Sequence, residues 1–207
     1  MNVDPQTLST NAMYHWMVGL IAPRPIAWVS TRSSDGVDNL APFSFFNGVG
    51  ANPPSLMFCP VNDGSGNPKD SLVNVRETGV FAVNLVTESV AESMNQSSHA
   101  YPSDVDEFDM AMLEKVPCQR IAASRVAKVA ACFECEMLHA ISLGHGPGGA
   151  NLVVGKIVHL HVDDAWIDDG RLTHRRLQTI GRMGGSEYVR TTDRFEMSRP
   201  IPPSLDP

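Results

Sequence analysis

The chain consists largely of short apolar runs separated by turn residues. Runs of this kind, rich in β-branched and aromatic residues and only a few positions long, are typical of strands. The segments that predict strands are Pro25–Thr31, Leu40–Phe46, Leu56–Val61, Val80–Val86, Ala127–Leu138 and Leu152–Val162. The protein is therefore expected to be mainly β.

The connection between the first two predicted strands indicates how they pair. It contains Asp35-Gly36, a dipeptide that favours a hairpin turn, so the two strands should be antiparallel neighbours. Along the second strand, the two-residue period places Pro42, Ser44 and Phe46 on one face. This partly polar face is available to line a site.

Two short helices interrupt the strand pattern. Asp70-Ser71 offers an N-cap to a helix that contains Leu72 and Val75, and Thr87 can cap another helix that ends near Gln96. Parallel strands would need a helix-sized crossover between each pair, and the chain has too few helices for that. The pattern therefore predicts an antiparallel barrel or sandwich with a few short helices.

Composition indicates one folding unit. The 207 residues include 16 glycines and 15 prolines, which are scattered along the chain and not gathered into a linker. We therefore expect a single domain over residues 1–207. From Arg190 onward, prolines and charged residues predict an arm that lies over a surface, and the tail Ser198–Pro207 has too few apolar residues to pack alone.

Charge and cysteine content argue against several classes of protein. The net charge of −7 and the sequence pI near 5.4 argue against nucleic-acid binding, because phosphate backbones attract basic surfaces. The 4 cysteines are too few and too irregularly spaced for the framework of a small secreted domain, which favours a reduced, cytoplasmic setting. We expect neither a targeting signal at Met1–Thr10 nor a membrane span, which needs about 20 apolar residues.

The segment Asn67–Ser71 combines a lysine, a hydroxyl and free backbone N–H groups at a predicted helix start. A phosphate gains charge-assisted hydrogen bonds in such a place, here from Lys69 and Ser71. An ordinary helix cap explains the same residues. Arg24, at the start of the first predicted strand, could reach the same anion, although an arginine at a strand edge is more often solvated.

The run Pro42–Gly50 gathers aromatic, hydroxyl, amide and glycine groups at the end of a strand. A flat heteroaromatic ligand such as an isoalloxazine needs apolar walls for its rings and donors at its polar edge, and glycine permits close approach. A core strand followed by a glycine-rich turn is the alternative interpretation.

Other chemistry has weaker support. A zinc site at Cys132 and Cys135 lacks a second pair of ligands, and the odd spacing places the two thiols on opposite faces of a strand. His159 and His161 share a strand face near Asp163-Asp164, but a half-exposed strand edge explains them as well. We therefore predict no metal site. The chain contains no G-x-S-x-G nucleophile elbow, and no G-x-G-x-x-G follows a strand within a βαβ unit.

A set of ordered segments carries a family resemblance. These segments are Pro23–Thr31, Asn39–Asn47, Pro53-Pro54, Lys69–Asn74 and Val80–Asn84, followed by Gly181–Gly185 with Tyr188. Together they resemble the flavin reductase-like family, to which the flavoredoxins belong. The resemblance implies an antiparallel Greek-key split β-barrel with a few short helices. Its core would span about residues 20–160, and residues 161–207 would form a C-terminal extension or dimer arm.

Members of this family are homodimers that bind FMN where the subunits meet. The resemblance implies that Ser30 and Thr31 lie near the ribityl phosphate. The residues expected to line the isoalloxazine are Ser44, Phe45, Phe46 and Asn47, and those expected to hold the phosphate are Lys69, Asp70 and Ser71. Arg24, Arg182 and Tyr188 complete the expected set, the last two by reaching the flavin of the partner.

The resemblance also implies the chemistry. FMN performs it, so no catalytic side chain is expected, and FAD stays open as an alternative. NAD(P)H would be a transient co-substrate, and a downstream oxygenase or another acceptor would receive the electrons. We therefore expect an NAD(P)H:flavin oxidoreductase, with a flavoredoxin-like electron carrier and a non-catalytic flavin-binding protein as alternatives.

One departure from the family pattern concerns the nicotinamide. Reductases of the family often carry a histidine shortly before the glycine of the late strand, whereas this chain has Ala150–Gly155 there. The nearest histidine, His145, lies in the glycine-rich segment Gly144–Gly149. The departure argues against direct, efficient reduction by a nicotinamide and leaves the expectation of FMN binding unchanged.

Overall fold

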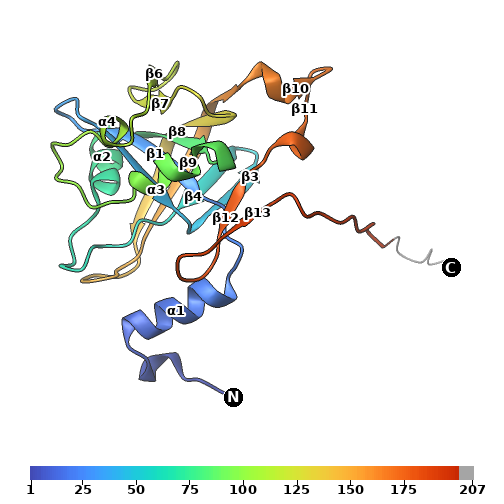
Figure 1. Cartoon of the computed structure of the whole chain (residues 1–207). Helices are drawn as coiled ribbons and strands as arrows, with labels where there is room; N and C mark the ends of the chain where they lie inside the picture. The colour runs from blue at the N-terminus through green and yellow to red at the C-terminus, as the bar shows by residue number, and fades with distance from the viewer. Residues whose placement is uncertain (201–207) are drawn as a thin grey trace, which may run out of the picture.

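An antiparallel sheet of 7 strands forms the body of the computed structural model, which describes residues 1–200. In order across the sheet, the strands are β2 (Asp38–Phe43), β1 (Ala27–Arg32), β5 (Val80–Leu85), β8 (Ala131–Ser142), β9 (Asn151–Val162), β4 (Pro54–Phe58) and β3 (Phe46–Ala51) (Figure 1). Pairs such as β1 with β5 and β9 with β4 are not consecutive in the chain, which is typical of Greek-key connections. The prediction of a mainly β, antiparallel fold is confirmed.

The first hairpin forms as the sequence predicts. Strands β1 and β2 pair antiparallel from Ala27 opposite Phe43 to Arg32 opposite Asp38. The turn between them contains Gly36 at φ 89°, a left-handed conformation that glycine adopts without steric cost. The Asp-Gly signal therefore identified the turn correctly.

The predicted strand Leu40–Phe46 is two strands. β2 ends at Phe43 and β3 begins at Phe46, so that Ser44 and Phe45 lie between them. The chain changes pairing partner here, since β2 pairs with β1 at one edge of the sheet while β3 pairs with β4 at the other. The simple alternation of faces predicted through Phe46 was therefore wrong beyond Phe43.

Two apolar clusters lie on opposite faces of the central strands. In β1, Trp28 belongs to one cluster and its neighbour Val29 to the other, as the two-residue period requires. Leu72, from the helix that follows β4, packs into the same cluster as Val29. Cys132 and Cys135 likewise fall in different clusters, which confirms that their thiols lie on opposite faces.

Four α-helices lie among the described residues. They are α1 (Thr10–Leu20), α2 (Asp70–Thr78), α3 (Ala91–Gln96) and α4 (Glu107–Met110). The pattern predicted α2 and the region of α3, but α1 was not expected; its N-cap is Ser9, whose hydroxyl accepts the N–H of Ala12. Figure 1 shows α1 at one end of the molecule, apart from the central strands. None of the helices within residues 1–200 is long and apolar enough to cross a membrane.

Short elements complete the fold. The two-stranded sheets are β6 (Lys115–Pro117) with β7 (Ser124–Val126), β10 (Ile167–Asp168) with β11 (Arg171–Leu172), and β12 (Ile180–Arg182) with β13 (Tyr188–Arg190). Single 3-10 turns occur at Pro5–Thr7, Glu88–Val90, Asp164–Trp166 and His174–Arg176. The strand predicted at Ala127–Leu138 thus begins later, at Ala131, and continues to Ser142.

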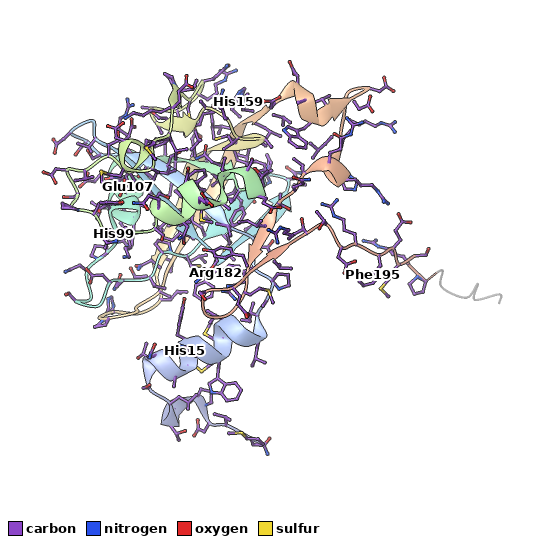
Figure 2. The ribbon with its side chains drawn as sticks, in the orientation of Figure 1. His15, His99, Glu107, His159, Arg182 and Phe195 are labelled. Carbon is purple, nitrogen blue, oxygen red and sulfur yellow. The ribbon has the colours of Figure 1, made fainter. Side chains whose placement is uncertain are left out.

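The segment after β13 extends away from the central strands (Figure 1). Phe195, labelled in Figure 2, is 85% exposed, and Met197 is 82% exposed. The sequence predicted from Arg190 onward an arm that lies over a surface; as far as residue 200 the segment is extended but does not lie over the central strands of this chain, and residues 201–207 lie outside the described part of the chain.

Candidate functional site

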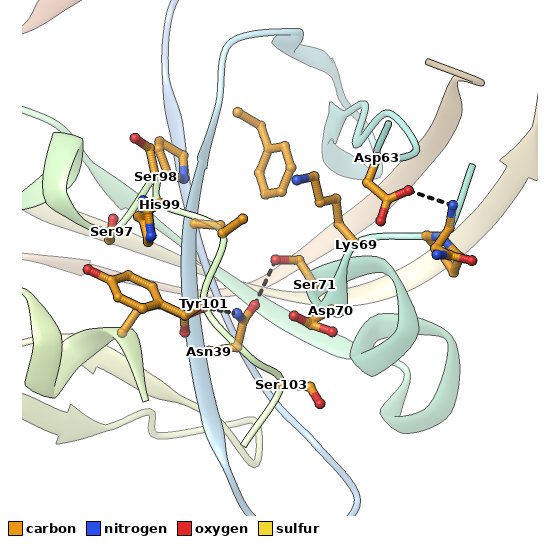
Figure 3. Close-up of a pocket in the computed structure, with 17 residues that line it drawn as sticks. Asn39, Asp63, Lys69, Asp70, Ser71, Ser97, Ser98, His99, Tyr101 and Ser103 are labelled. Carbon is orange, nitrogen blue, oxygen red and sulfur yellow. Dashed lines mark hydrogen bonds between the residues drawn. The ribbon is translucent and has the colours of Figure 1, made fainter. Parts of the chain in front are cut away.

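A pocket of about 400 Å³ opens between β2, the start of α2 and the loop that joins α3 to α4. Figure 3 shows the side chains of this pocket, with Lys69 and Asp63 on one side and His99 and Tyr101 on the other. The residues that line it are Asn39, Ala41, Pro42 and Phe43 from β2; Asp63 and Asn67–Ser71 before and at the start of α2; and Ser97–Tyr101, Ser103 and Glu107 opposite. Most of these groups are polar.

The start of α2 presents free donors to this pocket. The sequence predicted that Asp70 or Ser71 caps this helix, but the N-cap is Lys69, and no side chain caps the helix. The N–H groups of Leu72 and Val73 donate to the Lys69 carbonyl at 2.9 and 3.1 Å, but those of Asp70 and Ser71 find no acceptor within residues 1–200. Two unpaired N–H groups and the positive end of the helix dipole therefore lie at this pocket, an arrangement suited to an anion.

The Lys69 ammonium is available as well. Within the described residues no carboxylate lies within 4.0 Å of it, and its side chain is exposed. The nearby Asp63 accepts the N–H groups of Asn67 and Ser65 at 2.8 Å each, which lower the pKa of that carboxyl and hold the loop before α2. The charge of Lys69 is thus free to meet a ligand.

A hydrogen-bonded cluster lies beneath the pocket. The Ser71 hydroxyl donates to Oδ1 of Asn39 at 2.7 Å, and Nδ2 of Asn39 donates to Oε1 of Glu107 at 2.8 Å. The Leu40 N–H donates to the other oxygen of Glu107 at 3.0 Å. Burial raises the pKa of the Glu107 carboxyl despite these bonds.

A second hollow of about 200 Å³ continues the first. The two share Pro42 and Ser98 and are therefore adjacent; we call them together the groove. The remaining residues of the second hollow are Ile26, Ser44, Met94, Asn95, Arg182 and Tyr188. The guanidinium of Arg182 lies 4.5 Å from the centre of the Tyr188 ring, a cation–π contact that orients its charge.

The groove brings together half of the residues predicted for the site. Lys69, Asp70 and Ser71 line its first hollow, and Ser44, Arg182 and Tyr188 line its second. Segments far apart in the chain thus converge on the two hollows. Arg182 and Tyr188 line the second hollow of their own chain, whereas the sequence analysis expected them to reach the flavin of a partner.

Arg24 has a different place. Its guanidinium is buried and donates to the carbonyls of Val18 at 2.7 Å, Ile21 at 2.6 Å and Met183 at 3.0 Å, while Nε donates to the Ser44 hydroxyl at 3.3 Å. These acceptors occupy its donors, so Arg24 joins α1 to β12 and supports Ser44 from behind instead of lining the groove.

Ser30 and Thr31 also lie behind the groove. Both are fully buried; Ser30 donates to the Ser124 carbonyl at 2.6 Å, and Thr31 donates to Oδ1 of Asn39 at 3.3 Å. Their hydroxyls therefore bond within the protein. Neither residue is among those that line the two hollows.

The aromatic residues after β2 diverge. Phe45 contacts Tyr14 of α1 edge to face, with the ring centres 6.4 Å apart, and Phe46 packs against the same cluster as Val29. Asn47 is exposed on β3, and its side chain accepts the Gly48 N–H. None of the three lines the groove of this chain, because the strand that would have aligned them ends at Phe43.

Several residues of the groove were not singled out in the sequence. Asn39 stands inside a segment that carries the family resemblance but had no pattern of its own. Glu107 lies in the acidic stretch Asp104–Asp109, which resembles a solvated surface. His99 and Tyr101, whose rings lie 4.9 Å apart, were also missed. No local signal marks these residues, since packing between segments distant in the chain brings them to the pocket.

The histidines considered for other chemistry lie elsewhere. His145 is exposed in its loop and does not line either hollow. His159 and His161 pair with Glu134 and Cys132 across β8 and β9. Within residues 1–200, no group of three or more histidine, cysteine, aspartate or glutamate residues could hold a metal ion.

Most of the chain matches a known protein family. Residues 19–181 match the model of a family described as the flavin reductase like domain. Component B of nitrilotriacetate monooxygenase from Bacillus cereus is 30% identical, with a TM-score of 0.90 over 95% of this chain and 98% of that one. The 2-nitrobenzoate 2-nitroreductase of Pseudomonas fluorescens is 29% identical, with a TM-score of 0.87 over 100% and 98%.

A third solved structure concerns the fold alone. It is a proposed flavin reductase with a split barrel domain from Shewanella frigidimarina, 22% identical, with a TM-score of 0.79 over 97% of this chain and 100% of that one. The likeness confirms the expected split barrel.

Proposed function

The chain belongs to the flavin reductase like domain family, and from this premise we propose that it is an FMN-dependent oxidoreductase whose cofactor lies in the groove. The phosphate of FMN would meet the start of α2, and its ring system would extend toward the second hollow. NAD(P)H would supply the electrons, and FAD is the alternative cofactor.

The observation that carries this proposal is the set of free donors at Lys69–Ser71. A phosphate there would accept the unpaired N–H groups of Asp70 and Ser71 and the charge of Lys69. A helix start with two free N–H groups and an uncommitted ammonium is suited to a dianion. The hydroxyl of Ser71 is already used, because it donates to Asn39.

The second hollow supports the placement of the ring. Ile26, Pro42 and Met94 give it apolar walls, and Ser44 and Arg182 give it polar groups. The two hollows, of about 400 and about 200 Å³, suit a cofactor site when they are taken together. The guanidinium of Arg182 would favour negative charge on a ligand in this hollow.

When bound, FMN supplies the redox chemistry. The side chains of this protein bind and orient it: Lys69 holds the phosphate end, and the walls of the second hollow keep water from one side of the ring. None of them needs to act as a nucleophile.

The physiological acceptor is also a proposal. Since a 30% identical protein is component B of a monooxygenase, we propose that reduced flavin leaves this protein for an oxygenase component.

The 4 cysteines, all free, accord with a cytoplasmic location, which we propose as well. A second copy of the chain is the proposed partner, through the exposed apolar side chains of α1.

The test is spectroscopic. The purified protein is mixed with FMN, desalted, and examined for visible flavin absorption; NADH or NADPH is then added without oxygen. Bleaching of the bands, with rapid oxidation of the nicotinamide in the presence of free FMN, would support the oxidoreductase. Flavin that survives desalting without nicotinamide oxidation would identify an electron carrier instead. A protein that binds no flavin in a titration would overturn the proposal.

A further inference from the structure

The hydrogen bonds from Ser71 through Asn39 to Glu107, in the cluster beneath the pocket, all run in one direction. The hydroxyl of Ser71 donates to Oδ1 of Asn39, and Nδ2 of Asn39 donates to Glu107, at 2.7 and 2.8 Å (the first bond is drawn in Figure 3). A reversed Asn39 amide would turn its N–H groups toward the hydroxyl hydrogens and its oxygen toward the carboxylate. The carboxylate of Glu107 therefore determines how Asn39 is oriented.

A second branch enters the cluster from α2. Nδ2 of Asn74 donates to the Thr31 hydroxyl at 3.0 Å, and Thr31 donates to the same oxygen of Asn39 at 3.3 Å. Ser71 and Asn74 lie one turn apart on α2, so both branches run from the first turns of this helix to one acceptor. Hydrogen bonds aligned in one direction strengthen each other.

All members of the cluster are buried. The exposed fractions are 7% for Asn39, 4% for Glu107 and 1% for Ser71. Water therefore cannot replace a lost partner easily, and each bond restricts the position of α2 relative to β2. The free N–H groups of Asp70 and Ser71 belong to the helix turn that is held in this way.

We propose that Glu107 is a positioning residue for the phosphate site. Through Asn39 it holds the Ser71 hydroxyl, and thereby keeps the first turn of α2 and Lys69 in the geometry that receives an anion. Glu107 itself does not contact the phosphate. This inference rests on the proposed function, because it assigns the start of α2 to the phosphate of FMN.

Simple electrostatics and the positioning role predict opposite effects of Glu107→Gln on FMN binding. Glu107 lines the pocket, so its negative charge would repel a phosphate, and its removal would then tighten FMN binding. The positioning role predicts weaker binding when Glu107 becomes glutamine. Glutamine has one acceptor oxygen for two donors, the Leu40 N–H and the Asn39 amide, so one of these would lose its partner. The sign of the change therefore separates the two accounts.

The experiment compares FMN with riboflavin, which is the same flavin without the phosphate. Dissociation constants are measured by fluorescence titration for the wild-type protein, Glu107→Gln and Asp109→Asn, the last being an exposed carboxylate on the same helix. We expect Glu107→Gln to weaken FMN binding by about 10-fold, as for the loss of a hydrogen bond to a charged group. Riboflavin binding should stay unchanged, and Asp109→Asn should affect neither flavin.

A second variant tests the path and protects against misfolding. Ser71→Ala removes the far end of the chain of bonds with little change in volume, and it should also weaken FMN selectively. The double variant should lose no more FMN affinity than the single variant that binds FMN more weakly, because both substitutions break the same chain of hydrogen bonds. If Glu107→Gln does not fold, the selectivity of Ser71→Ala decides.

The outcomes are distinct. Unchanged or tighter FMN binding by Glu107→Gln overturns the positioning role, and so does an equal loss for FMN and riboflavin, which would indicate general loosening of the fold. A wild-type protein that binds both flavins equally, or neither, contradicts the proposed phosphate site itself. In that case the failure belongs to the proposed function and not to Glu107 alone.

Discussion

Lys69 is the residue whose charge the proposed phosphate site depends on most directly. Its replacement by alanine removes one charge-assisted contact, so FMN affinity should fall by about 1.5–3 kcal/mol, or roughly 10- to 150-fold. Riboflavin affinity should not change. Fluorescence titration of both flavins measures the effect, with Lys128→Ala, an exposed lysine elsewhere, as the control. Equal FMN affinity in Lys69→Ala and wild type would place the phosphate at another site.

Gly155 shows why one position in β9 admits no side chain. A Cβ built there would lie 2.4 Å from the Phe81 ring and 3.1 Å from Cβ of Cys135. Phe81 is fully buried and packs on Phe58 with ring centres 5.1 Å apart, so it has no space to retreat.

The prediction for this glycine concerns stability. Gly155→Ala should lower the free energy of unfolding by about 1–3 kcal/mol, as overpacking of a core does. Gly48→Ala is the control, because a Cβ at Gly48 meets nothing within 4 Å. Chemical denaturation measures both. Equal stability of the two variants would mean that the Phe81 ring moves aside without strain.

At the scale of elements, Asp38 joins the first hairpin to β6 and β7. This buried carboxylate accepts Nε of Arg32 at 2.9 Å, Nζ of Lys115 at 3.0 Å and the Ser124 hydroxyl at 3.1 Å. Burial opposes its ionisation, but the hydrogen bonds from Arg32 and Lys115 outweigh burial and lower the pKa of Asp38. Because the folded pKa lies below the unfolded one, this stabilisation is present above about pH 4 and is lost as pH falls further.

Asp38→Asn should therefore change how stability depends on pH. Near neutral pH it should cost about 1–3 kcal/mol, since Arg32 and Lys115 keep partial access to water. The difference from wild type should shrink as pH falls below about 4, when the wild-type carboxyl is protonated too. Thermal unfolding from pH 7 to pH 3 measures it, and Asp35→Asn in the exposed turn is the control. A difference that stays constant with pH would contradict the assigned pKa direction.

At the scale of the whole molecule, exposed apolar side chains collect outside the barrel. On and after α1, Leu20 is 75% and Ile21 55% exposed, and Trp16 is 42% exposed. Phe195 and Met197 of the extended segment are largely exposed as well. Large exposed apolar surfaces mark places where proteins associate, and a second copy of this chain is the partner that we propose.

Light scattering after gel filtration tests this assembly. The wild-type protein at micromolar concentration should have twice the chain mass of 22.5 kDa. Leu20→Glu should shift it toward the monomer, because a charge on a buried interface loses its solvation. Leu172→Glu, a similar change at exposed β11, should leave the mass unchanged. A monomeric wild type would remove the second copy from the proposal.

The sequence determined the features that depend on neighbouring residues. Short runs rich in β-branched and aromatic residues define β1, β5 and β9, Asp35-Gly36 defines the first hairpin turn, and Lys69–Ser71 marks the start of α2. Such signals are local, because strand period, turn conformation and free helix N–H groups follow from a few consecutive residues. The anion site at α2 could therefore be proposed before the fold was known.

The tertiary structure alone decided which groups reach the groove. It placed Ser30, Thr31 and Arg24 behind the groove, since acceptors from distant segments bind their donors. It also brought Glu107 to Asn39, 68 positions earlier in the chain. The face that a strand residue shows, and the partner that a buried polar group finds, depend on packing between segments remote in sequence. Local pattern carries no record of that packing.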